Sequence, residues 1–170
     1  TKEIYELAGD EFNISSPKQL GEVLFEKMKI TNKPKKTKTG QYSTSEEVLN
    51  ELSSKSDLVK LVLKFRSISK LLNTYINSLP KQLDKSTNRI HTEYVQTVAS
   101  TGRLSSINPN LQNIPIRTNR GREVRKAFIA RNKDYFLMAA DYSQIELRII
   151  ASLSNEENMM NAFKNKEDIH

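Results

Sequence analysis

The sequence predicts an α+β protein in which a helical first half is followed by strands with packed helices. Two observations carry this prediction. Apolar residues recur at helical spacing in the first half, whereas the stretch from Arg89 to Ser106 alternates and is rich in threonine, valine and tyrosine, as β-strands are. The chain has 170 residues, of which 36% are hydrophobic and 28% charged, so it is long enough to bury a core.

The first half opens with two helix patterns. Residues 1–7 resemble the middle of a helix. Ser16 followed by Pro17 then marks the start of a second helix, and Gln19 is placed to complete a capping box with Ser16. The apolar face of this second helix is formed by Leu20, Val23, Leu24 and Met28.

Two more helices are expected before the strands. Thr44 with Glu47 forms another capping box, which predicts a short helix through residue 52. From Asp57 to about Leu79 the apolar residues keep helical spacing, so one helix roughly 35 Å long is expected there, at 1.5 Å per residue. Pro80 is expected to end it. A helix of this length is suited to connect two structural units.

The second half mixes strands, loops and shorter helices. After the alternating segment come a loop with two prolines, residues 108–118, and a short basic helix, residues 121–128. The wholly apolar run from 136 to 140 predicts a strand that is buried on both faces. Further helices are expected at residues 143–153 and 158–163.

Charge and cysteine content narrow the classes of function. The net charge is +7 and the pI about 9.5, which favours a polyanionic partner because each neutralised phosphate releases counterions. The absence of cysteine excludes disulfides and thiolate metal sites. No apolar run approaches the roughly 20 residues that cross a bilayer, and the first residues show no secretory pattern, so no membrane partner is expected.

A lysine-rich loop over residues 31–45 is the first candidate site. Flexible ammonium groups and small hydroxyls suit contacts to a phosphate backbone that do not read bases. A merely solvated loop explains the composition equally well. The residues concerned are Lys33, Lys35, Lys36, Thr37, Lys38, Thr39, Gly40 and Ser43.

The amide-rich string from Thr101 to Arg117, TGRLSSINPNLQNIPIR, is the second candidate. Asparagine, glutamine and arginine can donate to the acceptors that every base pair presents in the minor groove, so the string suits a check of duplex geometry that is blind to sequence. The alternative is a tight turn whose amides satisfy main-chain groups. The amides are those of Asn108, Asn110, Gln112 and Asn113.

The third candidate is the carboxylate of Asp141, directly after the apolar run. Carboxylates at the exit of a buried strand are costly to place and commonly hold hard cations such as Mg²⁺. Phosphoryl transfer uses two such ions, about 3.5–4 Å apart, which activate the attacking hydroxyl and stabilise the developing charge. Taken alone, Asp141 is more simply explained as a capping aspartate between a strand and a helix.

Three strings, KKTKTGQYSTS, TGRLSS with PNLQNIP, and DYSQIELR, together resemble the family A DNA polymerases of the bacterial DNA polymerase I type, in the same order and spacing. The resemblance implies a helical thumb in residues 1–80, with its tip loop at 31–45. It further implies the first part of an antiparallel-sheet palm in residues 81–154 and the start of the fingers in residues 155–170.

For catalysis, the resemblance implies that Asp141 and the main-chain carbonyl of Tyr142 bind Mg²⁺, with two ions in the complete enzyme. Glu146 would lie against the sugar of the incoming deoxynucleoside triphosphate and exclude a 2′-hydroxyl. The nucleotide would also contact Gln144, Arg117 and His170.

For binding of primer–template duplex DNA, the resemblance implies that Arg103 contacts the minor groove at the primer terminus. His91 has no motif around it and is expected to be structural, and Arg148 is expected to be a salt-bridge partner. The remaining implied DNA contacts are Asn110, Gln112, Asn113, Lys35, Lys36, Lys38, Thr39 and Ser43.

Two alternatives stay open. A single-subunit RNA polymerase shares the palm and the metal-binding aspartate, but Glu146 and the LQNIP string argue against it. A non-catalytic duplex-binding module would keep the basic loop and the amides, but it would have no use for Asp141 at the end of a strand.

The family's fingers helix and its second catalytic carboxylate motif do not occur in this sequence. The 170 residues alone are therefore expected to be inactive, and their exposed palm surface is expected to allow self-association. The family further implies a cytoplasmic location at the bacterial nucleoid, or an organelle in a eukaryote.

Overall fold

The computed structural model describes residues 1–169, and the chain divides into two compact units, Thr1–Ala127 and Phe128–His170. The predicted α+β class is confirmed, because helices are accompanied by two small antiparallel sheets. The predicted subdomain boundaries after residues 80 and 154 stay predictions, because the two compact units meet at a different place, between Ala127 and Phe128. No helix within residues 1–169 is long and apolar enough to cross a membrane.

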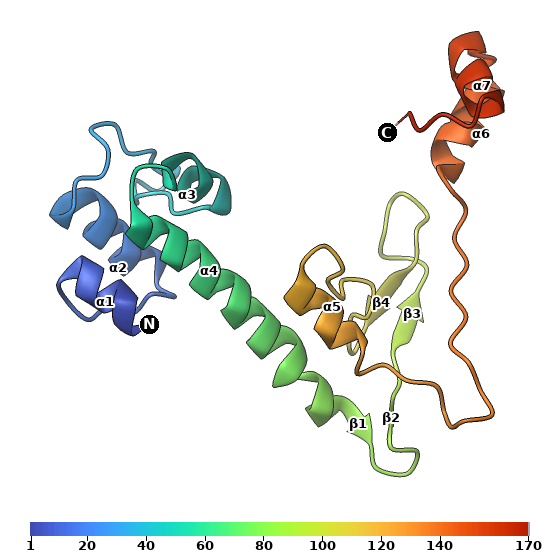
Figure 1. The fold of residues 1–170 in the computed structure, drawn as a ribbon, viewed down its shortest axis with the longest axis horizontal. Coiled ribbons are helices and arrows are strands. Elements are labelled where there is room, and N and C mark those ends of the chain that lie inside the picture. The colour runs from blue at the N-terminus through green and yellow to red at the C-terminus, as the bar shows by residue number, and fades with distance from the viewer. Residues whose placement is uncertain (170) are drawn as a thin grey trace. The chain divides into compact units, whose positions relative to one another are not determined.

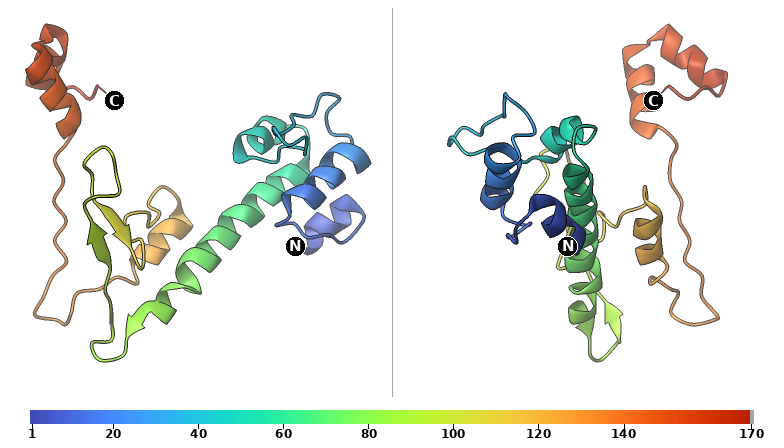
Figure 2. Two further views of the ribbon diagram at one scale, coloured as in Figure 1. Left: turned by 180° about the vertical axis from the view of Figure 1, so that it is seen from behind. Right: turned by 60° about the vertical axis from the view of Figure 1, so that its left-hand side comes forward.

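The first unit begins with helices that pack around the start of one long helix. Both α1 and α3 contact α4, and they lie beside it in Figures 1 and 2. The helices are α1 (Lys2–Ala8), α2 (Pro17–Gly21) with a π-helical continuation (Glu22–Lys27), α3 (Glu46–Leu52) and α4 (Asp57–Leu71). Their most deeply buried side chains are Leu20, Leu24, Leu49, Leu58, Val59 and Val62. Burying each of these stabilises the fold by about 1.5–3 kcal/mol.

The helix start at Ser16 is confirmed, but the capping box is only half formed. The Ser16 hydroxyl accepts from the main-chain N–H of Gln19 at 3.4 Å. The Gln19 side chain does not return to Ser16, because the Ser16 N–H already donates to the Asn13 carbonyl at 2.9 Å. It accepts instead from the N–H of Asn13 at 2.7 Å.

The cap predicted at Thr44 lies one residue further on. Ser45 is the N-cap of α3, and its hydroxyl accepts from the N–H of Val48 at 3.4 Å. Thr44 cannot serve in this role, because its side chain is buried and its hydroxyl accepts from the Arg66 guanidinium at 3.2 Å.

The long helix predicted from Asp57 is confirmed, with a different end. After α4 the chain continues as a π-helical segment, Leu72–Ile76, and then as a 3₁₀ turn, Leu79–Gln82. Pro80 therefore lies in the first turn of that 3₁₀ segment, where its missing N–H has no partner to lose. Tyr75 is buried near the end of the π-helical segment.

Short strands follow the long helix. Strand β1 (Leu83–Asp84) pairs antiparallel with β2 (Arg89–Ile90), and β3 (Glu93–Val95) pairs with β4 (Ser105–Ile107), with Tyr94 opposite Ser106. These strands occupy only parts of the predicted strand region, and a loop joins β3 to β4. Helix α5 (Asn119–Arg125) then forms at the predicted basic segment.

The second unit consists of an irregular segment and two helices, α6 (Ile145–Ser154) and α7 (Glu157–Lys164), which pack against each other. The buried strand predicted at 136–140 is wrong for this structure. Phe136 is 91% exposed and Met138 90%. A strand requires a neighbour that accepts its main-chain hydrogen bonds, and no strand within residues 1–169 pairs with this run.

Candidate catalytic and nucleic-acid-binding site

The lysine-rich loop ends in a tight tip. The N–H of Thr37 donates to the Gln41 carbonyl at 2.8 Å, and the N–H of Gly40 donates to the Thr37 carbonyl at 3.0 Å. Gly40 has a φ of 84°, a left-handed conformation that glycine adopts without strain. Lys38 and Thr39 are therefore presented at an exposed turn, and the Thr39 hydroxyl lies 2.9 Å from that of Thr37.

The lysines of this loop differ in their surroundings. Lys35 pairs with both carboxylate oxygens of Glu51, at 2.8 and 2.9 Å, and this hydrogen bond raises the pKa of Lys35. The ammonium of Lys36 lies 5.1 Å from the centre of the Tyr42 ring. Within residues 1–169, Lys33 and Lys38 have no ion-pair partner. Within residues 1–169, Glu51 thus competes with any other anion for Lys35, whereas no carboxylate pairs with Lys38.

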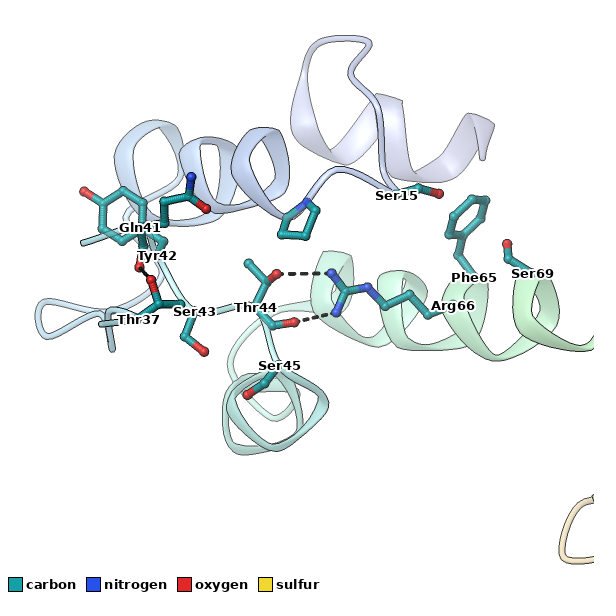
Figure 3. A pocket seen from close by; sticks show the side chains of 11 residues that line it. Ser15, Thr37, Gln41, Tyr42, Ser43, Thr44, Ser45, Phe65, Arg66 and Ser69 are labelled. Carbon is teal, nitrogen blue, oxygen red and sulfur yellow. Dashed lines mark hydrogen bonds between the residues drawn. The ribbon is translucent and has the colours of Figure 1, made fainter. Parts of the chain in front are cut away.

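A cavity of about 490 Å³ lies beside the loop, and Arg66 of α4 extends into it (Figure 3). The guanidinium donates to both the carbonyl and the hydroxyl oxygen of Thr44. Burial lowers the pKa of Arg66, and no carboxylate lies within ion-pair distance of it in residues 1–169. Arg66 was not predicted as a site residue, because a single arginine on the polar side of a helix has no distinctive spacing.

In the amide-rich string, the main-chain fold is organised by Ser106, whose side chain is fully buried. Its hydroxyl accepts from the N–H of Leu111 at 3.0 Å and lies 3.2 Å from the Pro109 carbonyl oxygen. The hydroxyl of Thr92 lies 2.7 Å away. Ser106 was not predicted as a site residue either, because a serine in a polar loop has no distinctive pattern.

The amides of the string take different roles. Gln112 uses both ends of its side chain inside the loop, accepting from the N–H of Ser106 at 3.2 Å and donating to the Leu104 carbonyl at 3.0 Å. Asn110 accepts from the N–H of Gln112 at 3.0 Å. The carbonyl of Asn113 accepts from the Tyr75 hydroxyl. The structural alternative considered for these amides therefore describes Gln112 well.

Helix α5 braces the last part of the string. Arg125 donates to the carbonyls of Pro115 at 3.2 Å and Ile114 at 2.8 Å. Gly121 is buried against Pro115 so closely that an added Cβ would lie 2.7 Å from the proline Cβ. The arginines of this basic helix thus hold the loop, while Arg117 is exposed and has no hydrogen-bond partner within residues 1–169.

At the start of the string, Gly102 has a φ of 75° and turns the chain immediately before Arg103. The side chain of Arg103 is exposed. His91, on the neighbouring hairpin, has its ring nitrogen 2.8 Å from the Thr87 hydroxyl, a contact that accords with its expected structural role.

The proposed metal ligands lie in the second unit, on the irregular segment before α6. Asp141 is exposed, and the side chain of Tyr142 is 80% exposed. Within residues 1–169, no group of three or more acidic, histidine or cysteine side chains is close enough to hold a metal. The described part of the chain therefore does not bring together a complete set of metal ligands.

Two side chains of the DYSQIELR string make contacts within the second unit. Gln144 donates to Asp168 at 2.7 Å. Arg148 is not the predicted salt-bridge partner: its Nε donates to the Ser143 carbonyl at 3.0 Å, and its guanidinium lies 4.4 Å from the centre of the Phe163 ring. Glu146 is exposed on the first turn of α6, and His170 lies outside the described residues.

Comparison with known proteins defines the class to which this fold and these motifs belong. The model of the family described as DNA polymerase family A matches residues 1–170, and the chain belongs to this family.

Particular relatives are bacterial. DNA polymerase I of Bacillus subtilis is 52% identical over 169 residues, which are 99% of this chain and 19% of that protein. DNA polymerase I of Pseudomonas aeruginosa is 52% identical over 170 residues, 99% of this chain and 18% of that protein. The solved structure of the POL domain of Pol1 from M. smegmatis, in complex with DNA primer-template and dNTP, matches with a TM-score of 0.87 and 43% identity. That match covers 99% of this chain and 30% of the other. The chain thus spans about a fifth of the length of these curated relatives.

Proposed function

We propose that this chain is part of a DNA-directed DNA polymerase and supplies its thumb, the first part of its palm and the start of its fingers. The observation that carries the proposal is the match to the family along all 170 residues. The three polar strings all lie within the matched residues. The proposed substrates are a primer–template duplex and deoxynucleoside triphosphates, and the proposed place of action is the bacterial cytoplasm, where the chromosome lies.

Asp141 and the main-chain carbonyl of Tyr142 are the proposed metal ligands in this chain. Both offer hard oxygen donors, and the Asp141 side chain is exposed, so the pair fits Mg²⁺. When bound, two such ions activate the primer 3′-hydroxyl and stabilise the charge that develops on the phosphate. Because the described residues do not bring together a complete set of metal ligands, we propose that the site is completed by other parts of the polymerase and that the 170 residues alone do not catalyse synthesis.

The remaining strings are proposed to hold the substrates. Glu146 lies against the sugar and selects the deoxy form, while Arg117 and His170 contact the nucleotide. Arg103 contacts the minor groove at the primer terminus. The duplex behind it is held by Asn110, Gln112 and Asn113 and by the loop residues Lys35, Lys36, Lys38, Thr39 and Ser43.

The decisive experiment replaces Asp141 by asparagine in the complete polymerase. The rate of primer extension should fall by more than about 100-fold. Mutating residues that only hydrogen-bond to metal ligands already lowers metal affinity or activity by about 10–100-fold. The affinity for duplex DNA should be retained. Asp134→Asn is the matched control, because Asp134 is an exposed aspartate in the same irregular segment and should leave extension unchanged. Unchanged extension in Asp141→Asn would favour a non-catalytic duplex-binding module.

Glu146→Ala separates a DNA polymerase from an RNA polymerase. If Glu146 excludes the 2′-hydroxyl, the variant should incorporate ribonucleotides that the wild-type enzyme rejects. A wild-type enzyme that already extends primers with ribonucleotides as well as with deoxynucleotides would contradict the assignment.

A further inference from the structure

Two side-chain contacts tie the segment after Asp141 to the last part of the second unit, and a third holds Arg148 to the main chain of that segment. The first involves Gln144, the N-cap of α6, whose φ of 53° is left-handed. A residue other than glycine keeps this strained conformation only where its surroundings hold it, and such positions gather at active sites.

The side chain of Gln144 provides that hold. Its amide nitrogen donates to Asp168 Oδ1 at 2.7 Å, across 24 positions of sequence. The orientation of the amide is fixed by chemistry, because an ionised carboxylate only accepts hydrogen bonds. The amide oxygen is buried and has no partner within the described part of the chain.

Arg148 makes the other two contacts with one planar group. The Nε edge donates to the Ser143 carbonyl at 3.0 Å, two residues after Asp141, and the guanidinium lies 4.4 Å from the centre of the Phe163 ring on α7. A guanidinium can donate along its edge and stack through its face at the same time, which an ammonium cannot. The chain that leaves Asp141 is thereby fastened to α7.

We propose that Gln144, Arg148 and Phe163 are positioning residues for the metal-binding carboxylate. They fix the path of residues 141–143 against α7 and against Asp168, the residue that precedes the proposed nucleotide contact by two positions. The inference rests on the proposed function and deepens it. It assigns Gln144 a role through Asp168, in place of a direct contact with the nucleotide.

A polarity swap in the complete polymerase tests the Gln144 contact. Gln144→Glu places a carboxylate against that of Asp168, so kcat should fall by about tenfold, because displacing a reacting group by about 1 Å costs up to about 100-fold. The Mg²⁺ concentration for half-maximal activity should rise. The double variant Gln144→Glu, Asp168→Asn restores a donor–acceptor pair in the opposite direction and should recover kcat to within about threefold of wild type, with KM for the nucleotide nearly unchanged throughout. A raised KM that the double variant does not recover would show a direct nucleotide contact and overturn the proposal.

The stacking contact needs its own pair of variants. Phe163→Tyr keeps the ring and should retain the wild-type kcat, whereas Phe163→Leu and Arg148→Lys should each lower kcat by about fivefold and raise the Mg²⁺ requirement, since both lose the planar stack. Thermal unfolding is measured on each variant. Losses of activity that follow the unfolding midpoint while the Mg²⁺ requirement stays constant would mean that the contacts are merely structural.

Asp141→Asn in the same assays distinguishes a failure of the proposed function from a failure of the positioning role. Retained extension in Asp141→Asn contradicts the proposed function itself. Lost extension in Asp141→Asn together with unchanged kcat and Mg²⁺ requirement in the Gln144, Arg148 and Phe163 variants leaves the function standing and overturns the positioning role.

Discussion

Removing the hydroxyl of Ser106 should loosen the amide-rich loop without unfolding the first unit. In Ser106→Ala the N–H of Leu111 loses its acceptor at 3.0 Å. The Thr92 hydroxyl is not left unpaired, because it also lies 2.9 Å from the Ile107 carbonyl and 2.8 Å from that of Pro109. The cost is therefore that of one unsatisfied, partly buried donor, about 1–2 kcal/mol.

The effect is measured as amide hydrogen exchange at Leu111. A loss of about 1–2 kcal/mol corresponds to exchange that is about 5–30-fold faster, if the loop opens locally. Ser105→Ala is the matched control, since Ser105 is the neighbouring serine, is only half-buried and makes no side-chain hydrogen bond within residues 1–169.

Two results would refute this reasoning. Unchanged exchange at Leu111 in Ser106→Ala would mean that the hydroxyl does not hold the loop. Equal acceleration in Ser105→Ala would mean that the strand responds to any loss of a hydroxyl, and not to the loss of this hydrogen bond.

The other predictions concern the core, a turn and the basic loop. Leu49→Ala should lower the free energy of unfolding by about 2–5 kcal/mol in denaturant titrations, since Leu49 is fully buried. Hydrogen bonds from Ser86 and Thr87 hold the pKa of Asp84 well below its usual range, so its stabilisation of the β1–β2 hairpin is present above the unfolded pKa of about 3.9 and lost as pH falls below it. Asp84→Asn should therefore speed hairpin amide exchange most at neutral pH, and progressively less as pH falls from about 4 toward the folded pKa. Lys38→Ala should reduce the slope of log K for duplex DNA against log salt by about 0.9, and Lys35→Ala by less, because Glu51 already pairs with Lys35.

Local patterns predicted the helices of this chain well. The serine and proline at residues 16 and 17 set a helix start that depends on neighbours within four positions, and the spacing from Asp57 onward gave α4. The error at Thr44 arose from a contact 22 positions away, the guanidinium of Arg66, which no local pattern contains.

Longer-range pairing explains the other differences. An apolar run such as 136–140 becomes a strand only beside another strand, so its composition alone does not decide its structure. Arg148 has the right chemistry for the ion pair expected of it but contacts the Ser143 carbonyl and the Phe163 ring. The DNA contact expected of Gln112 stays a prediction, although its side chain also bonds within the loop. Whether a side chain faces a ligand or its own main chain depends on the fold around it. The metal-binding and DNA-binding roles themselves stay predictions.

We expect the charge of Asp141 also to oppose aggregation of the exposed apolar run at 136–140. Asp141 is the only charged residue between Asp134 and Glu146, in a stretch without proline. Uncharged apolar segments of this kind pair with one another and aggregate, and a single charge beside them acts as a gatekeeper. Asp141→Asn should therefore sediment as larger species than Asp141→Glu, which keeps the charge. A variant that has lost its catalysis to precipitation is thereby distinguished from one that has lost a metal ligand.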